Sequence, residues 1–162
     1  MPNKRELGQF YTTNYEYILQ GISVPSGTQL IEPFCGEGDL VKWVGKPFDE
    51  MYDIDPKIIG CVNRDTLMNP PSYMGKWVIT NPPYLAKNKT DNKRPMNLYK
   101  VDDLYKCFME TLILDPPDGG VIIIPLNYWC SVRNTGSNKF CKEFWVSKMN
   151  IFEEQVFNDT TY

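Results

Sequence analysis

Hydrophobic and polar positions along this 162-residue chain form two alternating kinds of segment. Short runs of mostly apolar residues predict β-strands, and longer runs with apolar residues three and four positions apart predict α-helices. The predicted strands are residues 29–34, 50–54, 60–64, 76–80, 121–124 and 150–157. The predicted helices are residues 39–44, 102–114 and 138–146, and a further short helix is expected after residue 13.

Turn-forming residues separate these segments. Asp55-Pro56 ends the second strand and Asn81-Pro82-Pro83 ends the fourth, because proline cannot donate a backbone hydrogen bond to a neighbouring strand. Residues 121–124 are all β-branched, which predicts a strand buried on both faces. Strands that alternate with helices through short loops predict an α/β fold with a mostly parallel central sheet. In such a sheet, ligands bind beyond the carboxyl ends of the strands.

Composition narrows the possible chemistry. The length and the 42% share of hydrophobic residues suit one domain spanning residues 1–162. The chain has no histidine, which excludes Ser-His-Asp triads, Cys-His pairs and zinc sites with imidazole ligands. Its 17 basic and 20 acidic side chains give a net charge of −3. That balance argues mildly against a wide nucleic-acid-binding face.

The cysteines and the N-terminus suggest an intracellular protein. The five cysteines contain no Cys-x-x-Cys pair, so we expect reduced thiols without a disulfide framework or a metal site. The first residues lack an apolar signal segment, and no apolar run is long enough to span a membrane. The expected location is the cytoplasm.

Two polar groups follow the first two predicted strands. Gly36 and Gly38 form a turn that lets backbone N–H groups approach a ligand, although an ordinary strand–helix turn has the same composition. Glu32 stands inside the preceding apolar strand and needs a partner there. Asp53, at the end of the second strand, can accept both hydroxyls of a ribose. A solvated acidic strand end is the alternative.

The sharpest motif is Asn81-Pro82-Pro83-Tyr84. Two prolines leave the local backbone with acceptors and no donors, Asn81 adds an acceptor oxygen, and Tyr84 adds a ring that can stack. These features suit a planar amine, whereas a proline-stopped strand with an incidental tyrosine is the alternative. The following residues 87–100 contain five basic side chains against Asp91 alone. This segment is either a solvated loop or a place where a phosphate backbone passes.

Taken in order, six segments resemble the S-adenosylmethionine-dependent adenine-N6 DNA methyltransferases. These segments are residues 8–13, 32–38, 53–56, 64–67, 81–84 and 120–129. The resemblance implies a Rossmann-like methyltransferase fold with helices on both faces of the sheet. It also implies a catalytic domain without the family's target-recognition region, from a bacterial, phage or viral source. The implied partners are S-adenosylmethionine and double-stranded DNA, with no metal.

The resemblance also implies roles for individual residues. Thr12 and the 36–38 turn would hold the methionine part of the cofactor, Asp53 its ribose, and Asp65 the amino group of its adenine. Asn81 and the Pro82 carbonyl would bind the target amine, and Tyr84 would stack on a flipped-out base. The full set of implied cofactor-binding residues is Gln9, Phe10, Thr12, Glu32, Pro33, Phe34, Gly36, Gly38, Asp53 and Asp65. The implied nucleic-acid-binding residues are Pro83, Lys87, Lys89, Lys93 and Arg94.

Other classes of protein share parts of this pattern. Asn-Pro-Pro-Tyr also occurs in enzymes that methylate a glutamine side chain in proteins and in some RNA methyltransferases, and each presents a planar nitrogen to the same acceptors. Residues 8–13 favour DNA adenine among them. A catalytically silent subunit is another alternative. A nicotinamide-dependent oxidoreductase is disfavoured because the three-glycine fingerprint is missing.

Overall fold

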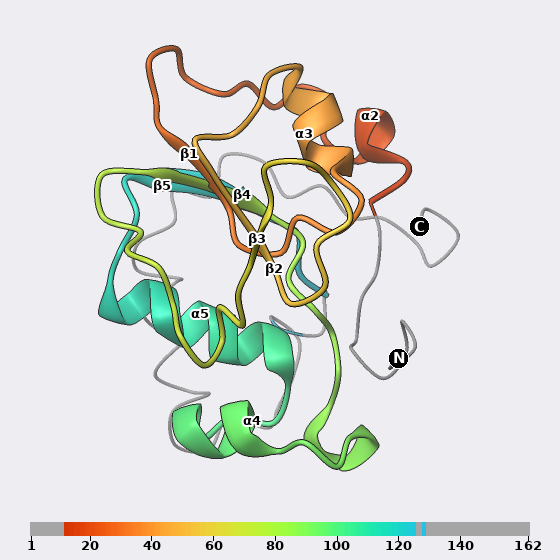
Figure 1. Cartoon of the computed structure of the whole chain (residues 1–162), viewed down its shortest axis with the longest axis vertical. Coiled ribbons are helices and arrows are strands. Elements are labelled where there is room, and N and C mark those ends of the chain that lie inside the picture. Colours follow the sequence, from red (N-terminus) through yellow and green to blue (C-terminus); the bar gives the residue numbers. More distant parts are fainter. Residues whose placement is uncertain (1–11, 126–127, 129–162) are drawn as a thin grey trace.

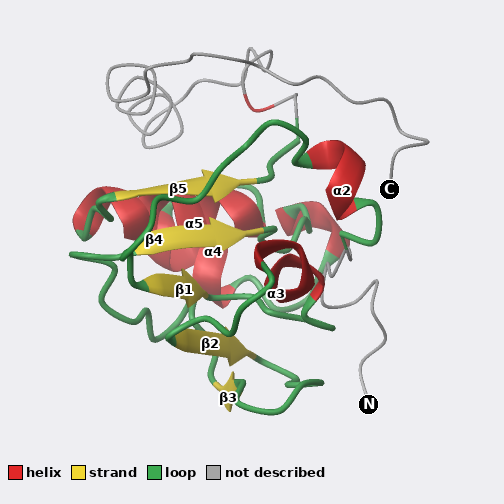
Figure 2. Cartoon of the chain, turned by 90° about the horizontal axis from the view of Figure 1, so that it is seen from above, coloured by secondary structure: helices red, strands yellow, loops and turns green. Residues whose placement is uncertain are grey.

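The structure is a computed structural model of the chain that describes residues 12–125 and residue 128. Its centre is a parallel sheet of five strands in the order β3-β2-β1-β4-β5. The strands β1, β2, β4 and β5 point the same way in Figure 2, and β3 pairs in parallel with β2. The strands are β1 (Leu30–Glu32), β2 (Glu50–Asp53), β3 (Val62–Asn63), β4 (Trp77–Thr80) and β5 (Gly119–Ile122).

Helices cover both faces of this sheet, as Figure 1 shows. On one face lie α2 (Tyr15–Ile18) and α3 (Asp39–Val44), and on the other lie α4 (Arg94–Tyr99) and α5 (Leu104–Leu114). A short 3-10 helix, η1 (Lys87–Lys89), precedes α4. The α/β Rossmann-like fold expected from the sequence is therefore confirmed. None of the helices within the described part of the chain is long and apolar enough to cross a membrane.

Strand residues that alternate along the chain supply the two halves of the core. Leu30 and Ile79 belong to the cluster beneath α2 and α3. Their neighbours Ile31 and Val78 belong to the cluster beneath α4 and α5. All four are fully buried. Successive side chains of a strand point to opposite faces, so each strand contributes to both clusters. The central strands are thus apolar throughout because they are covered on both sides.

Chain order reverses between β1 and β4. From β1 the chain passes outward to β2 and β3, and it then returns to pair β4 with the other side of β1. Such a reversal leaves a crevice at the carboxyl ends of the two central strands, and open α/β sheets bind ligands there. Residues that follow β1 and β4 are accordingly the first to consider as a site.

Most predicted elements agree with the structure. The helix predicted at 39–44 is α3. The strands predicted at 29–34, 50–54, 60–64 and 76–80 are present but shorter than expected. The prediction for 121–124 was wrong in two respects, because β5 begins at Gly119 and its Val121 and Ile122 are only partly buried. The two glycines allow a close approach to β4. A Cβ on Gly120 would lie 2.2 Å from the Val78 carbonyl oxygen. The segments predicted at 138–146 and 150–157 lie outside the described residues.

One cysteine pair departs from the expectation of reduced thiols. Cys35, in the turn after β1, forms a disulfide with Cys61, which lies in the link between β2 and β3. That link contains no helix. It folds over the turn, where Ile58 lies against Gly38. The expectation was wrong for this pair because the short link brings together two cysteines whose sequence spacing gave no sign of contact. Cys107 is free and buried.

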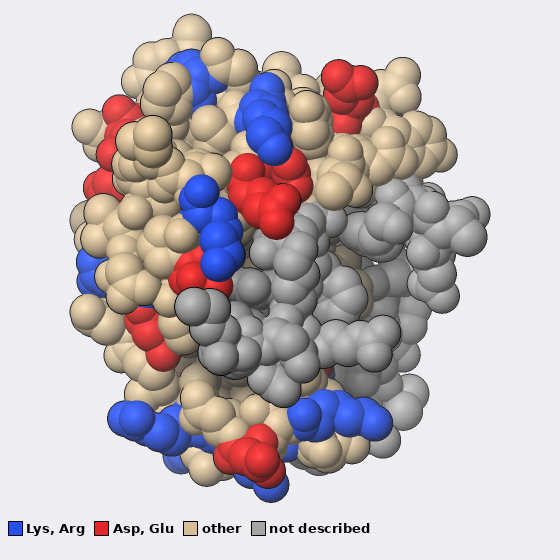
Figure 3. All heavy atoms as spheres, turned by 45° about the vertical axis from the view of Figure 1, so that its right-hand side comes forward, with Lys and Arg blue, Asp and Glu red and all other residues tan. Residues whose placement is uncertain are grey.

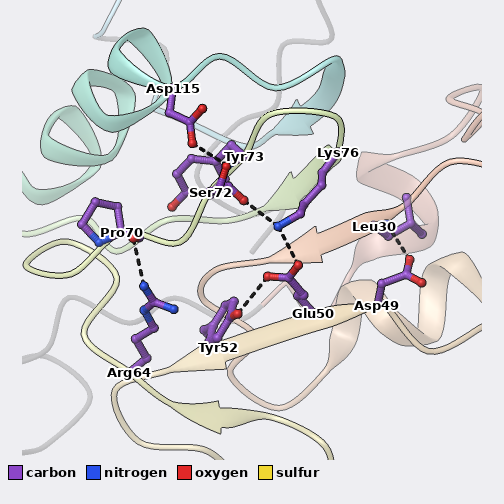
Figure 4. A network of polar contacts seen from close by, with 10 residues as sticks. All are labelled: Leu30, Asp49, Glu50, Tyr52, Arg64, Pro70, Ser72, Tyr73, Lys76 and Asp115. Atoms are coloured by element: carbon purple, nitrogen blue, oxygen red, sulfur yellow. Dashed lines mark hydrogen bonds and ion pairs between the residues drawn. The ribbon is translucent and has the colours of Figure 1, made fainter.

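Polar contacts join the amino-terminal ends of β1, β2 and β4 (Figure 4). Lys76 Nζ lies 2.5 Å from Glu50 Oε1 and donates to the Ser72 carbonyl. The Tyr52 hydroxyl donates to the other Glu50 oxygen at 2.8 Å. Burial of the Glu50 carboxyl opposes its ionisation, but Lys76 and Tyr52 outweigh burial and lower the pKa of Glu50. Asp49 adds a hydrogen bond from the Leu30 N–H.

Replacing Lys76 with Met should lower the free energy of unfolding by about 1 kcal/mol at pH 7. Because the pKa of Glu50 is lowered by folding, its contribution is present above the unfolded pKa of about 4.3 and is lost as the pH falls through the folded pKa. The difference between the variant and the native chain should therefore shrink below about pH 4 in urea unfolding curves. Lys42→Met is the matched control. It removes an exposed i,i+3 pair with Asp39 and should change stability by less than about 0.5 kcal/mol. Equal losses of unfolding free energy in both variants would contradict a stabilising role for the Lys76–Glu50 pair.

Candidate functional site

The predicted site residues line up along the carboxyl edge of the sheet. Asp65 follows β3, Asp53 ends β2, Gly36 follows β1 and Asn81 follows β4. Because the sheet order is β3-β2-β1-β4, these four residues occur along the edge in that same sequence. The glycine turn and the acidic residues therefore occupy one half of the edge, and the Asn-Pro-Pro-Tyr motif begins the other half.

Asp53 holds the glycine turn in place. Its Oδ2 accepts a hydrogen bond from the Gly36 N–H at 2.9 Å, and its Oδ1 accepts one from the Asp55 N–H at 2.8 Å. The side chain is 4% exposed, so the alternative of a solvated acidic strand end was wrong. Gly36 and Gly38 have φ values of 49° and 75°, in the left-handed region that favours glycine. The carboxylate thus stabilises a backbone shape that the two glycines make possible.

Glu32 is a buried acid at the centre of this edge. Only 1% of the residue is exposed, and within the described residues neither carboxylate oxygen has a hydrogen bond of ordinary geometry. Burial raises the pKa of Glu32 well above its usual range, and the nearby Thr80 hydroxyl and Phe34 N–H oppose that rise only in part. An acid in this state gains from a positive charge placed close to it.

The loops after β1 and β3 are connected across the end of β2. Thr66 Oγ1 donates to the Pro33 carbonyl at 3.1 Å. The neighbouring Asp65 accepts the Leu67 and Met68 N–H groups with its Oδ1, at 3.2 Å and 3.1 Å. Within the described part of the chain, Asp65 Oδ2 has no hydrogen-bond partner.

Asn81 contacts one residue near the start of the described chain and one within its own motif. Its Nδ2 donates to Thr12 Oγ1 at 3.0 Å, and its Oδ1 accepts from the Tyr84 hydroxyl. That hydroxyl also lies 2.6 Å from the Ile123 carbonyl oxygen. A hydroxyl has one proton, so it donates to one of these two acceptors at a time. The Tyr84 hydroxyl is thus in contact with the acceptor oxygen that the sequence assigns to a target amine.

Aromatic contacts link Tyr84 to Tyr105 of α5 and Tyr105 to Tyr128. Tyr84 packs edge-on against Tyr105 at 5.9 Å between ring centroids, and Tyr105 packs in the same way against Tyr128 at 6.0 Å. Tyr105 and Tyr128 are buried. Sequence reasoning did not find these two tyrosines as neighbours of the site. The helical spacing of residues 102–114 shows that Tyr105 is a core position, but not which loop it supports.

The remaining predicted cofactor residues do not all lie in the glycine turn. Pro33, Gly36 and Gly38 are buried within the turn itself. Phe34 instead packs its ring edge-on against Phe108 of α5, at 5.1 Å between centroids. Gln9 and Phe10 lie outside the described residues. Within the described residues, no group of three or more cysteine or acidic side chains could hold a metal ion.

The basic segment, residues 87–100, is held by contacts of the two residues that precede it. Leu85 N–H donates to Asp103 Oδ1 at 3.0 Å, and Ala86 and Asp103 form an antiparallel bridge. Basic side chains gather beyond these contacts, at the end of the molecule where η1 and α4 lie (Figure 3). The predicted members of this group are Lys87, Lys89, Lys93 and Arg94. Among the described residues, none of these four has an acidic partner within ion-pair distance.

Comparison with known families adds an independent finding. The family model of the Eco57I restriction-modification methylase matches residues 76–157, about half of the chain. The matched part includes β4, the Asn81–Tyr84 motif, the basic segment, α5 and β5. The glycine turn, Asp53 and Asp65 precede it. A search of curated proteins returned no match.

Replacing Asp53 with Asn tests its structural role. The amide can accept only one of the two N–H groups that Asp53 now accepts, from Gly36 and Asp55. We expect the free energy of unfolding to fall by about 1–3 kcal/mol, because a buried donor loses its acceptor. Urea unfolding measures this loss. Asp55→Asn changes an exposed carboxylate two residues away and serves as the control. An Asp53→Asn variant as stable as the Asp55→Asn control would contradict the structural role of Asp53.

Proposed function

The chain belongs to the Eco57I restriction-modification methylase family, and from that premise we propose that it methylates DNA. The proposed reaction transfers a methyl group from S-adenosylmethionine to the N6 amino group of an adenine flipped out of the duplex. The observation that carries the proposal is the position of Asn81. Its acceptor oxygen stands at the end of β4, next to the turn that Asp53 stabilises, at the reversal of strand order.

The half of the edge formed by β1, β2 and β3 suits the cofactor. S-adenosylmethionine carries a positive sulfonium and ammonium, and the buried Glu32 carboxyl would compensate this charge from beneath the turn. Asp53, which ends β2 and accepts from the Gly36 and Asp55 N–H groups, would take the ribose hydroxyls. Asp65 Oδ2 would accept from the adenine amino group. When bound, the cofactor supplies a methyl group already activated for transfer.

The half formed by β4 and β5 suits the target amine. The N6 lone pair of adenine is delocalised into the ring, which makes the nitrogen a poor nucleophile. Asn81 Oδ1 and the Pro82 carbonyl would each accept one of its hydrogens and favour a more localised lone pair. The Tyr84 hydroxyl leaves Asn81 Oδ1 when the amine arrives, and its ring is then available to stack on the base.

No histidine is needed for these steps. Formation of the N6–CH3 bond would break the S–CH3 bond and release S-adenosylhomocysteine. The methylated nitrogen, positively charged and therefore acidic, would lose its surplus proton to solvent without a strong base, and the hydrogen-bond acceptors come from an amide and the backbone. Basic residues beyond the motif would contact phosphates next to the flipped base. Lys87, Lys89, Lys93 and Arg94 suit this role because no acidic partner within the described residues neutralises them.

A transfer assay tests the proposal. The chain is incubated with S-adenosylmethionine labelled in its methyl group and, separately, with duplex DNA, RNA and a protein mixture. Label in duplex DNA that is recovered as N6-methyladenine after digestion supports the proposal. Label that enters only RNA or only glutamine side chains would reject the DNA substrate and retain the chemistry. Absence of label from all three would reject methyl transfer.

Replacing Asn81 with Ala should lower the rate of methyl transfer at least about 100-fold, because the target amine loses an acceptor that is itself only 8% exposed. Cofactor binding, measured by calorimetry, should change little, since Asn81 lies on the other half of the edge. Gln29→Ala is the control. It removes an exposed carboxamide at the opposite end of β1 and should leave the rate unchanged. An Asn81 variant with the native rate would exclude this residue from catalysis.

Replacing Glu32 with Gln should weaken cofactor binding about tenfold and remove its dependence on pH. The raised pKa keeps Glu32 protonated in the free chain to a higher pH than usual, and a cationic cofactor favours the ionised form. Binding should therefore release a proton, and affinity should rise with pH up to the pKa of Glu32. Calorimetry in buffers of different ionisation enthalpy counts that proton.

Glu110→Gln is the matched control for this experiment. Burial also raises the pKa of Glu110, but this residue lies in α5, within the layer behind the sheet. In both variants stability should become less sensitive to rising pH, because a native acid with a raised pKa binds more protons than the unfolded chain. Only Glu32→Gln should alter cofactor binding. An unchanged proton release in that variant would contradict its proposed role.

A further inference from the structure

We propose that Thr12 is a positioning residue that orients the Asn81 side-chain amide when the cofactor binds. The inference rests on the proposed function, and it assigns to Thr12 a second role besides holding the methionine part of the cofactor. Asn81 Nδ2 donates to Thr12 Oγ1 at 3.0 Å, across 69 positions in the sequence. Thr12 is 3% exposed and Asn81 is 8% exposed, so water competes little for this hydrogen bond.

The orientation of the amide decides whether Asn81 can act. Its oxygen and nitrogen ends have nearly the same shape, and a rotation of the side chain by half a turn exchanges them. With Oδ1 toward the target, the amide accepts a hydrogen from the amine. With Nδ2 toward the target, two donors face each other and the amine is repelled. A contact that distinguishes the two orientations is therefore needed.

Tyr84 cannot supply that contact during the reaction. Its hydroxyl lies against both Asn81 Oδ1 and the Ile123 carbonyl oxygen, and the target amine must take the same Asn81 oxygen. Once the base is in place, the hydrogen bond with Thr12 remains on the opposite side of the amide. Thr12 is thus a partner that can hold the amide while Oδ1 accepts from the target.

A threonine hydroxyl alone does not select one orientation, because it can donate as well as accept. The selection arises if its proton is committed elsewhere. The methionine part of the cofactor ends in a carboxylate, which accepts and never donates. When the Thr12 O–H donates to that carboxylate, Thr12 Oγ1 can only accept, and the amide must turn its Nδ2 toward it. Cofactor binding would then set Oδ1 toward the target.

The first experiment needs no catalysis. The exchange of the Asn81 side-chain amide protons with water is followed by NMR in the nitrogen-15-labelled full chain, and the signals are identified by their loss in Asn81→Asp. S-adenosylhomocysteine is the probe, because it has the same carboxylate and no methyl group to transfer. In the native chain and in Thr12→Ser, the probe should slow exchange about fivefold to tenfold, because it excludes the orientation in which Thr12 donates to Oδ1 and the amide N–H groups do not bind Thr12. In Thr12→Val, which keeps the shape and loses the hydroxyl, the probe should have no such effect.

The second experiment separates kcat from KM. At saturating cofactor, Thr12→Val should lower kcat about fivefold to tenfold, and Thr12→Ser should restore it. A carboxylate at position 81 has two equivalent oxygens and no wrong orientation. If Asn81→Asp retains transfer, adding Thr12→Val to it should therefore not lower kcat further.

The outcomes distinguish a failure of the role of Thr12 from a failure of the proposed methyl transfer. Thr12→Val with native kcat at saturating cofactor, and with native slowing of amide exchange, would overturn the role of Thr12 and leave methyl transfer intact. Absence of transfer by the native chain, together with probe-dependent slowing of exchange that Thr12→Val abolishes, would reject the proposed function and retain the contact. Amide exchange that the probe does not affect in the native chain would overturn the coupling.

Discussion

Parallel pairing of β1 with β2 on one side and β4 on the other determines where every candidate residue stands. Parallel strands end at the same edge of a sheet, so residues that follow each strand are neighbours in space although tens of positions separate them in sequence. The pairing itself depends on apolar side chains on both faces, and Leu30, Ile31 and Val78 are buried completely. A polar residue can enter this layer only near the strand ends. Glu32 and Asp53 are the last residues of β1 and β2, and Asp65 and Asn81 follow β3 and β4.

The edge satisfies most of its polar groups with partners from the chain itself. Asp53 accepts from the turn, Asn81 donates to Thr12, and the Tyr84 hydroxyl contacts Asn81 Oδ1. A ligand therefore exchanges one set of hydrogen bonds for another, which keeps the buried groups paired in both states. Glu32 differs from these residues because its carboxyl has no such partner among the described residues. The two kinds of residue suit different tasks. The satisfied groups fix geometry, whereas the unsatisfied acid favours a ligand of positive charge.

Local patterns in the sequence were enough for the fold and for the motifs, but not for the contacts between motifs. The helix at 39–44 follows from its spacing and its flanking glycines, and the strand before Asn81 follows from two prolines that cannot continue a ladder. The contact of Thr12 with Asn81 and the pairing of Cys35 with Cys61 depend on how loops cross the strand ends, which no periodicity records. The error at 121–124 has a similar origin. Gly119 and Gly120 do not resemble strand residues, yet the lack of a Cβ is what lets them lie against Trp77 and Val78.

The net charge of −3 describes the chain poorly because its charges are sorted in space. Lys42, Lys57, Lys76 and Lys106 each pair with a nearby acid. The basic side chains of η1 and the start of α4 have no such partner among the described residues, and they lie beyond the motif that would receive the base. An acidic average is thus compatible with a local basic surface, provided that the acids are used to hold strands and turns together. Four such cations can position a phosphate backbone, but contacts with phosphates do not read base sequence. Selection of a particular adenine would therefore require base contacts from residues outside this basic group.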